Sequence, residues 1–235
     1  LDCGLCEVKQ GPLTITFRVR LLKPTPVNLK KILALGPALG QVLHLDDVRL
    51  TDTARGILIE LPSPLPKTPS GVQLARDTQG LKVAIGLDQW RQPMLVDLRQ
   101  HPTLLLVGPP RRGKTSAMKS ILYALARQNP VGRLHYVIIS QRRNDWVAFE
   151  QAVGCIGLVN DPAEALRVME WGVGQLMAQR SARGASDAAT VFVLDDLTNL
   201  LKRVPEIAAP IGEMATMGGG VNLFQLIGTH HAGSK

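Results

Sequence analysis

The spacing of hydrophobic positions changes partway along this chain, and the change predicts two parts with different secondary structure. In the first part, residues 13–21 alternate branched or aromatic with polar side chains as a half-buried strand does, and residues 56–62 predict another strand. Residues 29–43 have the apolar spacing of a helix, which Gly36-Pro37 interrupts. These segments predict a small α+β subdomain.

A proline-rich segment, LPSPLPKTPSG at residues 61–71, follows the first part. Repeated prolines exclude a packed helix and a central strand, so this segment is interpreted as a stiff connector. We therefore expect a subdomain over residues 1–78, with its connector at 61–71, and a second domain over residues 79–235. Residues 81–88 and 94–98 have the pattern of short strands that lead into the second domain.

Continuous apolar runs alternate with helical patterns in the second part. The runs at 103–108, 134–140, 190–196 and 221–229 are typical of strands that lie fully buried in a parallel sheet. One helix between them places Met118, Ile121, Leu122 and Leu125 on a single face. Another is expected to begin at an N-cap, Asp161, followed by Pro162 at its first position. The alternation predicts an α/β fold, with a parallel sheet and helices on both faces.

The stretch GPPRRGKTS, residues 108–116, follows the first of these strands and opens a helix. Its Gly-x-x-x-x-Gly-Lys-Thr spacing is that of a phosphate-binding loop, whose amides and helix dipole hold phosphate oxygens. Lys114 is expected to reach the β and γ phosphates of a nucleotide, and the Thr115 hydroxyl to bind Mg²⁺. The predicted nucleotide-binding residues are Gly108, Pro109, Pro110, Arg111, Arg112, Gly113, Lys114, Thr115 and Ser116.

Two carboxylates, Asp195 and Asp196, end the apolar strand about eighty residues after the loop. A carboxylate at this place can hold the Mg²⁺ shell, so Asp195 joins Thr115 as a predicted metal residue. Asp196 is the candidate for the base that positions the attacking water. ATP and Mg²⁺ are the expected cofactors, and Lys114, Asp195, Asp196 and Thr229 are predicted to be catalytic.

Composition bears on the partner and the compartment. A formal net charge of +8 and a pI near 9.8 suit a polyanionic partner such as nucleic acid, although charge alone is a weak signal. Three cysteines form no disulfide framework, which fits a reducing compartment. No apolar run is long enough to span a membrane, the first residues do not resemble a secretion signal, and the start at Leu1 suggests a segment of a longer protein.

Several segments together resemble the motor region of the FtsK/SpoIIIE family of DNA translocases. GPLTITFRVR and RGILIELPSP are similar to strands of the family's β subdomain, and AIGLDQWRQPMLVDLRQHPTLLLVG to the segment before its phosphate loop. VNDPAEALRVMEWGVGQLMAQR and NLFQLIGTH are similar to a later helix and strand. The resemblance implies a RecA-like ATPase that forms a homo-oligomeric ring, usually a hexamer, and pumps double-stranded DNA through its centre. It also implies a cytoplasmic location, with any tether to the inner face of the membrane supplied by a segment outside this chain.

Four departures from the family pattern bear on the chemistry. Arg111-Arg112 stand where the family commonly has small residues, and arginine fits that loop only where no positive φ is required. Asp196 replaces a glutamate that positions water. Thr229 matches a polar residue that senses the γ phosphate, but His230 replaces the following glutamine, and Ser140-Gln141-Arg142 replace an Asp-Pro-Lys sequence.

Two classes of function therefore stay open. One is an ATP-driven motor for double-stranded DNA, in chromosome partition or in conjugative transfer of a mobile element. The other is a nucleotide-binding scaffold that does not hydrolyse ATP, or a ring ATPase that moves another polymer. The presence of Lys114, Thr115 and Asp195 together favours the motor.

Overall fold

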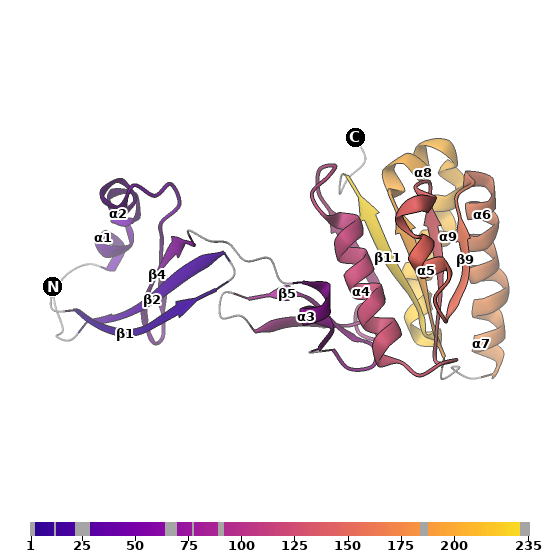
Figure 1. The fold of residues 1–235 in the computed structure, drawn as a ribbon, viewed down its shortest axis with the longest axis horizontal. Helices are drawn as coiled ribbons and strands as arrows, with labels where there is room; N and C mark the ends of the chain where they lie inside the picture. The colour runs from indigo at the N-terminus through magenta and orange to yellow at the C-terminus, as the bar shows by residue number, and fades with distance from the viewer. Residues whose placement is uncertain are drawn as a thin grey trace. The chain divides into compact units, whose positions relative to one another are not determined.

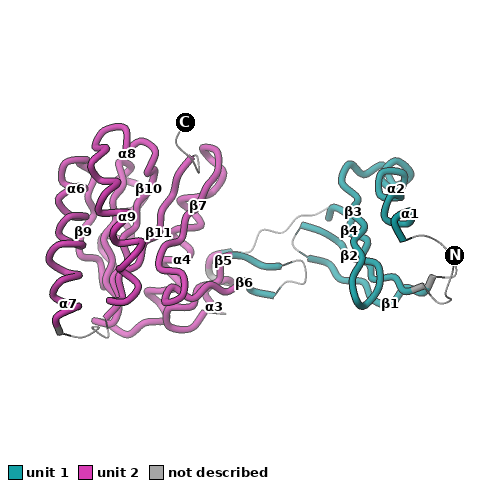
Figure 2. The backbone as a smooth tube through the Cα atoms, turned by 180° about the vertical axis from the view of Figure 1, so that it is seen from behind, with its two compact units in different colours: residues 1–70, 86–94 teal, residues 71–85, 95–235 magenta. Residues whose placement is uncertain are grey.

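The computed structural model describes residues 3–11, 13–21, 29–63, 70–76, 78–88, 92–183 and 188–230. Two compact units divide the chain (Figure 2): unit 1 comprises residues 1–70 and 86–94, and unit 2 comprises residues 71–85 and 95–235. Among the described residues, none of the helices has both the length and the apolar character needed to cross a membrane.

Unit 1 is built on a four-stranded antiparallel sheet in the order β1-β2-β4-β3. Its strands are β1 (Cys3–Gln10), β2 (Thr14–Leu21), β3 (Arg49–Thr53) and β4 (Gly56–Pro62). The predicted strands at 13–21 and 56–62 are confirmed as β2 and β4, whereas β1 and β3 were not predicted. Two short helices, α1 (Leu29–Leu33) and α2 (Gly36–Leu43), confirm that Gly36-Pro37 interrupts the helical pattern, because the proline opens α2. Of the expected connector, residues 64–69 lie outside the described residues.

Unit 2 contains a five-stranded parallel sheet in the order β7-β11-β10-β8-β9 (Figure 1). The strands are β7 (Thr103–Val107), β8 (Leu134–Ser140), β9 (Cys155–Val159), β10 (Ala189–Asp195) and β11 (Leu223–Thr229). Helices connect the strands, as the alternating pattern predicts. Asp161 caps α6 (Pro162–Trp171) by accepting a hydrogen bond from Glu164 N at 2.9 Å, and Pro162 is the first helical residue, so both expectations are confirmed.

Alternate residues of each central strand face opposite sides of the sheet and build two separate cores. On one side, Tyr136 and Ile138 of β8 pack in a cluster with the apolar face of α4 (Lys114–Gln128), including the four residues predicted to share that face. On the other side, Val137 and Ile139 of the same strand pack with residues of α6, α8 (Leu197–Arg203) and α9 (Ala208–Met217). Helices therefore cover both faces, in agreement with the predicted layers.

The expectation that the strand at 103–108 is fully buried is wrong. Within the described chain β7 is an edge strand that pairs only with β11, and Leu105 and Val107 are 50% and 46% exposed. A continuous apolar run is typical of a central strand, but the pattern carries no information about which strand lies beside it. The phosphate loop therefore leaves the sheet from its edge.

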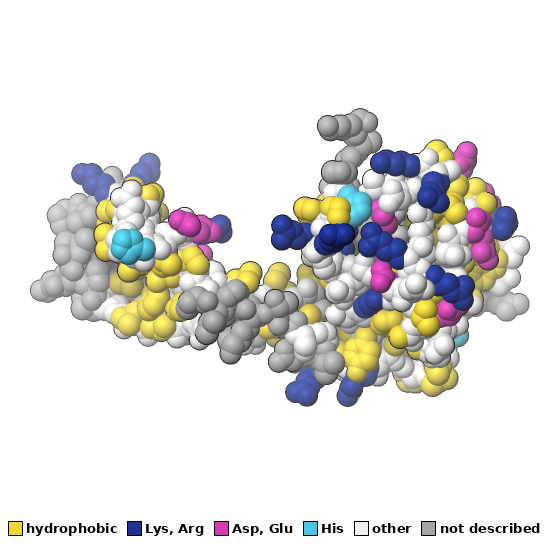
Figure 3. Space-filling model, turned by 45° about the horizontal axis from the view of Figure 1, so that its top comes forward, with side chains coloured by type: hydrophobic (Ala, Val, Ile, Leu, Met, Phe, Trp, Pro, Cys, Tyr) yellow, Lys and Arg dark blue, Asp and Glu magenta, His cyan; other side chains and the backbone are white. Residues whose placement is uncertain are grey.

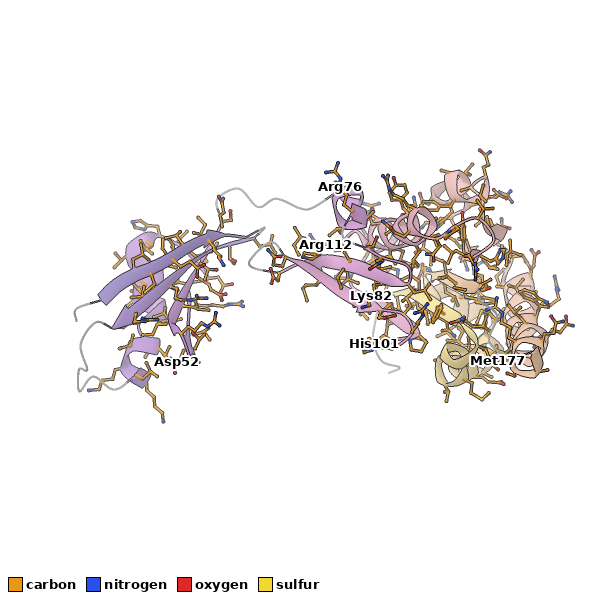
Figure 4. The ribbon with its side chains drawn as sticks, turned by 90° about the horizontal axis from the view of Figure 1, so that it is seen from below. Asp52, Arg76, Lys82, His101, Arg112 and Met177 are labelled. Atoms are coloured by element: carbon orange, nitrogen blue, oxygen red, sulfur yellow. The ribbon has the colours of Figure 1, made fainter. Side chains whose placement is uncertain are left out.

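Unit 2 begins earlier than the predicted boundary at residue 78. Helix α3 (Gly71–Arg76) packs against α4, and Gln128 Nε2 donates to Ala75 O at 3.0 Å. Asn129 Nδ2 donates to Gly80 O at 2.9 Å, which ties the following turn to the end of the same helix. The strands β5 (Lys82–Leu87) and β6 (Pro93–Asp97) form a two-stranded sheet after it. Arg76, at the end of α3, points away from the helices into solvent (Figure 4).

A one-turn π-helix over Gly172–Met177 joins α6 to α7 (Ala178–Arg183), so the predicted continuous helix has a wide turn in its middle. Met177 is buried in the cluster beneath it (Figure 4).

Arg180 of α7 is also buried and donates to Val221 O, Asn222 O and Thr190 Oγ1 at 2.7–3.0 Å. Burial lowers the pKa of its guanidinium. The other described short elements are α5 (Val147–Glu150) and 3₁₀ turns at Arg143–Asp145, Pro205–Ile207 and Gly218–Val221.

Gly172 is expected to tolerate no side chain. A Cβ there would lie 2.7 Å from Phe192 Cζ and 2.9 Å from Met214 Cε, and the phenylalanine ring is fixed in the sheet. Gly172→Ala should therefore lower the free energy of unfolding by about 1–3 kcal/mol, measured by urea titration. The matched control is Gly174→Ala in the same turn, where a Cβ meets nothing within 4 Å; equal losses in both variants would contradict the packing argument.

Candidate nucleotide-binding site

The loop of residues 108–116 connects the end of β7 to the first turn of α4. Gly113 has a φ of 85° and precedes Lys114, the first residue of the helix. This left-handed glycine turns the chain so that the loop wraps the positive end of the helix dipole. Gly108 N donates to Thr229 O at 3.2 Å, which holds the start of the loop against the end of β11. The loop has the local structure that binds a phosphate group.

Arg111 adopts a left-handed backbone conformation, with a φ of 61°. Left-handed backbone costs a residue with a Cβ roughly 1–2 kcal/mol. Arg111 therefore occupies a position with positive φ, the backbone conformation that we expected to be unfavourable for an arginine in this loop. Arg111 lines the cavity beside the loop, whereas Arg112 does not and is exposed.

The ammonium group of Lys114 contacts the phosphate loop and His230, the residue that follows β11. Its Nζ donates to Gly108 O at 2.7 Å and to Pro109 O at 3.0 Å. It also lies 3.1 Å from His230 Nδ1. The lysine is thereby held at the mouth of the loop, where a phosphate would bind.

Asp195, at the end of β10, is the best-supported carboxylate of the site. It is 8% exposed, and Thr115 Oγ1 donates to its Oδ1 at 3.1 Å. Trp146 Nε1 donates to its Oδ2 at 3.1 Å, and Ser140 Oγ does so at 3.5 Å. The threonine of the loop and the first carboxylate, eighty positions apart in the sequence, are thus in direct contact, as the two motifs predict.

Trp146 is a site residue that the sequence reasoning missed. Its fully buried ring makes an edge contact with Phe149, with centroids 5.6 Å apart, and Lys119 Nζ lies 5.5 Å from its centroid. Tyr136 Oη donates to Phe149 O at 2.8 Å, and burial raises the pKa of Tyr136 to about 12. Burial of the tryptophan ring and its contact with Phe149 hold the indole N–H in place beside Asp195. The only signal in the sequence was a lone tryptophan shortly after a buried strand.

Asp196 has a φ of 67° and precedes α8, so that its carboxylate turns away from the direction of β10. Asn199 Nδ2 donates to its Oδ2, and His230 Nε2 lies 3.3 Å from its Oδ1. The two adjacent aspartates therefore have different neighbours. Asp195 is bonded by the loop threonine and the indole, whereas Asp196 is bonded by an amide and lies next to an imidazole.

Thr229, expected to sense a γ phosphate, lies outside the cavity. It is 5% exposed, and its Oγ1 is 2.8 Å from Thr198 Oγ1. Because side chains alternate along a strand, Thr229 at the end of β11 turns toward α8, while His230 turns toward Lys114. The structure thus brings His230 into the site instead of Thr229.

The cavity beside the loop has a volume of about 530 Å³ and is lined by both basic and acidic side chains. Figure 3 shows Lys and Arg side chains close together on this face of unit 2, with Asp and Glu between them. The charged residues in the lining are Arg111, Lys114, Lys119, Arg142, Asp145, Asp195 and Asp196, together with His230. Such a cavity suits a polyanion that carries a divalent cation.

The donor set fits Mg²⁺ bound together with phosphates. Thr115 and Asp195 offer oxygen ligands next to each other, and Mg²⁺ is commonly held by one or two protein oxygens, substrate phosphates and waters. In the part of the chain that the structure describes, no group of three His, Cys, Asp or Glu side chains forms a metal cage of its own. The site therefore fits a cation that arrives with its nucleotide.

A Gly-x-x-x-x-Gly-Lys-Thr loop between a parallel strand and a helix, facing a carboxylate at the end of another strand, defines a P-loop ATPase domain. A sequence model of the FtsK/SpoIIIE family matches residues 70–196, more than half of the chain. The chain belongs to the FtsK/SpoIIIE family, which confirms the predicted resemblance.

Individual known proteins are similar over most of this chain. DNA translocase FtsK of Helicobacter pylori is 23% identical over 261 residues, covering 97% of the chain, and the chain spans only 30% of that relative's length. The pCW3 conjugation coupling protein TcpA, solved as a monomer with ATPgS, gives a TM-score of 0.59 at 14% identity over 99% of this chain and 72% of its own. The cytoplasmic domain of the Type VII secretion ATPase EccC of Thermomonospora curvata gives 0.58 at 16% identity, covering 92% and 30%. These likenesses confirm the predicted P-loop fold.

Replacing Arg111 by glycine is expected to stabilise the domain. Relief of the left-handed strain, roughly 1–2 kcal/mol, exceeds the entropy that glycine adds to the unfolded chain, about 0.4–1 kcal/mol. Arg111→Gly should therefore raise the free energy of unfolding in a denaturant titration. Arg112→Gly is the matched control, because Arg112 is not at positive φ and should only lose stability. A loss of stability in both variants would show that Arg111 is not strained.

Proposed function

We propose that this chain is the ATP-hydrolysing motor of a DNA translocase that acts on double-stranded DNA as a homo-oligomeric ring. The observation that carries the nucleotide part is the 3.1 Å contact of Thr115 with Asp195 inside a cavity that Lys114 and Asp196 also line. Family membership and the similarity to DNA translocase FtsK support the proposal that the polymer it moves is DNA.

Each group of the site has a distinct role in this proposal. The loop amides and Lys114 bind the phosphates, and Arg111, at the cavity wall, adds a charge-assisted contact. Thr115 and Asp195 would hold a Mg²⁺ ion, which would supply positive charge beside the phosphate oxygens. Asp196 orients a water molecule and accepts its proton, while the water oxygen bonds to the γ phosphorus and the bond to the bridging oxygen of ADP breaks.

The shorter side chain of Asp196, relative to a glutamate, does not by itself exclude this role. The left-handed backbone at Asp196 changes the direction in which its carboxylate points. One carboxylate oxygen, Oδ1, is buried and has no hydrogen-bond partner among the described residues, and His230 Nε2 lies 3.3 Å from it. A buried, under-satisfied carboxylate oxygen is a strong acceptor for a water proton. Asp196 therefore retains the properties of a general base.

The competing proposal is a ring ATPase that moves a polypeptide. The similarity in fold to a secretion ATPase favours it, and the fold is common to both kinds of motor. The charge of +8 favours nucleic acid. Arg180 does not contribute to a DNA-binding surface, since it is buried in hydrogen bonds, and Arg143 pairs with Glu150. Lys202, Arg203 and Arg142 are among the exposed cations of unit 2.

The two aspartates are expected to separate binding from turnover. Asp195→Asn should weaken nucleotide binding only when Mg²⁺ is present, whereas Asp196→Asn should leave binding intact and reduce phosphate release by at least about a hundredfold. Binding is measured by titration of a fluorescent ATP analogue with and without Mg²⁺. Lys114→Ala should lose binding in both conditions, and Glu213→Gln, an exposed carboxylate change on α9, is the control. If Asp196→Asn hydrolyses ATP at the wild-type rate, Asp196 is not the general base.

DNA binding is expected to be electrostatic and independent of sequence. Contact with three or more phosphates gives a slope of log affinity against log salt of about −3, so affinity should fall roughly fiftyfold between 50 and 200 mM salt. Fluorescence anisotropy with duplexes of unrelated sequence should give equal affinities. A single strand should bind less tightly, because the basic segments at 142–145, 178–184 and 201–203 contain no aromatic residue on which bases could stack. Absence of duplex binding at low salt, with intact ATP hydrolysis, would favour the polypeptide motor.

A further inference from the structure

His230 lies between the lysine of the phosphate loop and the second carboxylate. Its Nδ1 is 3.1 Å from Lys114 Nζ, and its Nε2 is 3.3 Å from Asp196 Oδ1. The side chains of His230 and Asp196 are 20% and 18% exposed, so the contacts are shielded from water. One imidazole ring thus connects the phosphate-binding group to the candidate base.

The hydrogen-bonding capacities of these groups fix the tautomer of the ring. An ammonium group donates and never accepts, so His230 Nδ1 accepts and carries no proton. The ring proton is then on Nε2, which faces the carboxylate. Asp196 Oδ1 has no hydrogen-bond partner among the described residues, and the Nε2–H group, 3.3 Å away, is directed at it as an electrostatic contact. This tautomer places a donor and not a lone pair against the carboxylate.

The backbone positions the ring independently of the lysine. His230 N donates to Thr198 Oγ1 at 3.2 Å, and that hydroxyl is also 2.8 Å from Thr229 Oγ1. These bonds attach the end of β11 to α8, which begins directly after Asp196. A change at Lys114 therefore leaves the ring next to Asp196.

Lys114, in contrast, already uses its whole donor capacity. An ammonium group has three N–H donors, and here they are directed at Gly108 O, Pro109 O and His230 Nδ1. A phosphate oxygen can be bound by Lys114 only in exchange for at least one of these contacts. His230 Nδ1 therefore competes with phosphate for Lys114, while Nε2 of the same ring faces Asp196, the candidate base.

We propose that His230 is a positioning residue that links phosphate binding at Lys114 to the orientation of Asp196; the inference rests on the proposed ATPase function. When ATP binds, Lys114 exchanges His230 Nδ1 for a phosphate oxygen. The Nε2–H group continues to hold Asp196 Oδ1, which keeps the carboxylate directed toward the attacking water. The ring thus opposes nucleotide binding and supports turnover.

The test compares His230→Leu with His230→Gln. Leucine removes both contacts, so ATP should bind about threefold to tenfold more tightly, and kcat should fall at least about tenfold. Glutamine offers an amide oxygen to Lys114 and an amide N–H to Asp196, so it should restore both values toward those of the wild type. A merely structural role would weaken binding and turnover together, and would not be rescued by glutamine.

His101→Leu is the matched control, because His101 is exposed at the turn between β6 and β7 and lies outside the cavity (Figure 4). A His230→Leu protein that turns over at the wild-type rate, or binds ATP less tightly, overturns the inference. A wild-type protein that binds no ATP overturns the proposed function as well.

A second measurement reads the tautomer directly in the wild-type protein and uses a variant only to assign the signal. In the wild-type protein labelled with ¹⁵N-histidine, the ring of His230 is identified by the signal that His230→Gln removes. Its nitrogen shifts should be those of the Nε2–H tautomer, and addition of a non-hydrolysable ATP analogue should move the Nδ1 signal more than the Nε2 signal. An Nδ1–H tautomer, or a charged ring, overturns the inference.

Discussion

The parallel register of the central strands is the constraint on which the site depends. Asp195 is paired in register with Ser140 of β8, and Thr229 with Val107 of β7. Four strands therefore end at the same level, and the residues that follow them share one edge of the sheet. The loop after β7, the carboxylates after β10 and the histidine after β11 meet there without any direct sequence proximity. A shift of one strand by one residue would turn Asp195 to the opposite face.

Two residues of this edge are held in left-handed backbone, and both border the cavity. Arg111 and Asp196 have φ values of 61° and 67°. Aspartate tolerates this conformation better than arginine does, because its short polar side chain can bond locally. Strain that persists in a packed domain is a sign that the surrounding structure fixes the backbone for another reason. At Asp196 that reason is the direction of the carboxylate; at Arg111 it is the turn that a glycine would make at lower energy.

The sequence predicted those parts of the site that a local pattern encodes. The loop spacing identifies Lys114 and Thr115, and an apolar strand that ends in two acids identifies Asp195 and Asp196; the structure brings these residues into one cavity. It did not predict Trp146, because the indole reaches Asp195 only after β8 and β10 have paired. Nor did it predict that Thr229 turns away from the cavity, since that depends on which face of β11 meets α8. The prediction that β7 is fully buried failed for a similar reason, because the apolar pattern of a strand does not show which strands lie beside it.

The differing surroundings of the two aspartates are the strongest argument that they perform different tasks. The oxygens of Asp195 accept from Thr115, Ser140 and Trp146, so both are engaged and the carboxylate has little freedom to reorient. A rigid carboxylate next to Thr115 suits the holding of a cation, because Mg²⁺ requires nearly ideal coordination geometry. Asp196 accepts one hydrogen bond at Oδ2, whereas Oδ1 accepts none from the described residues and only lies 3.3 Å from the imidazole. Because water can bond Oδ1 without displacing another donor, proton acceptance is available at Asp196, whereas at Asp195 it would displace a bonded side chain.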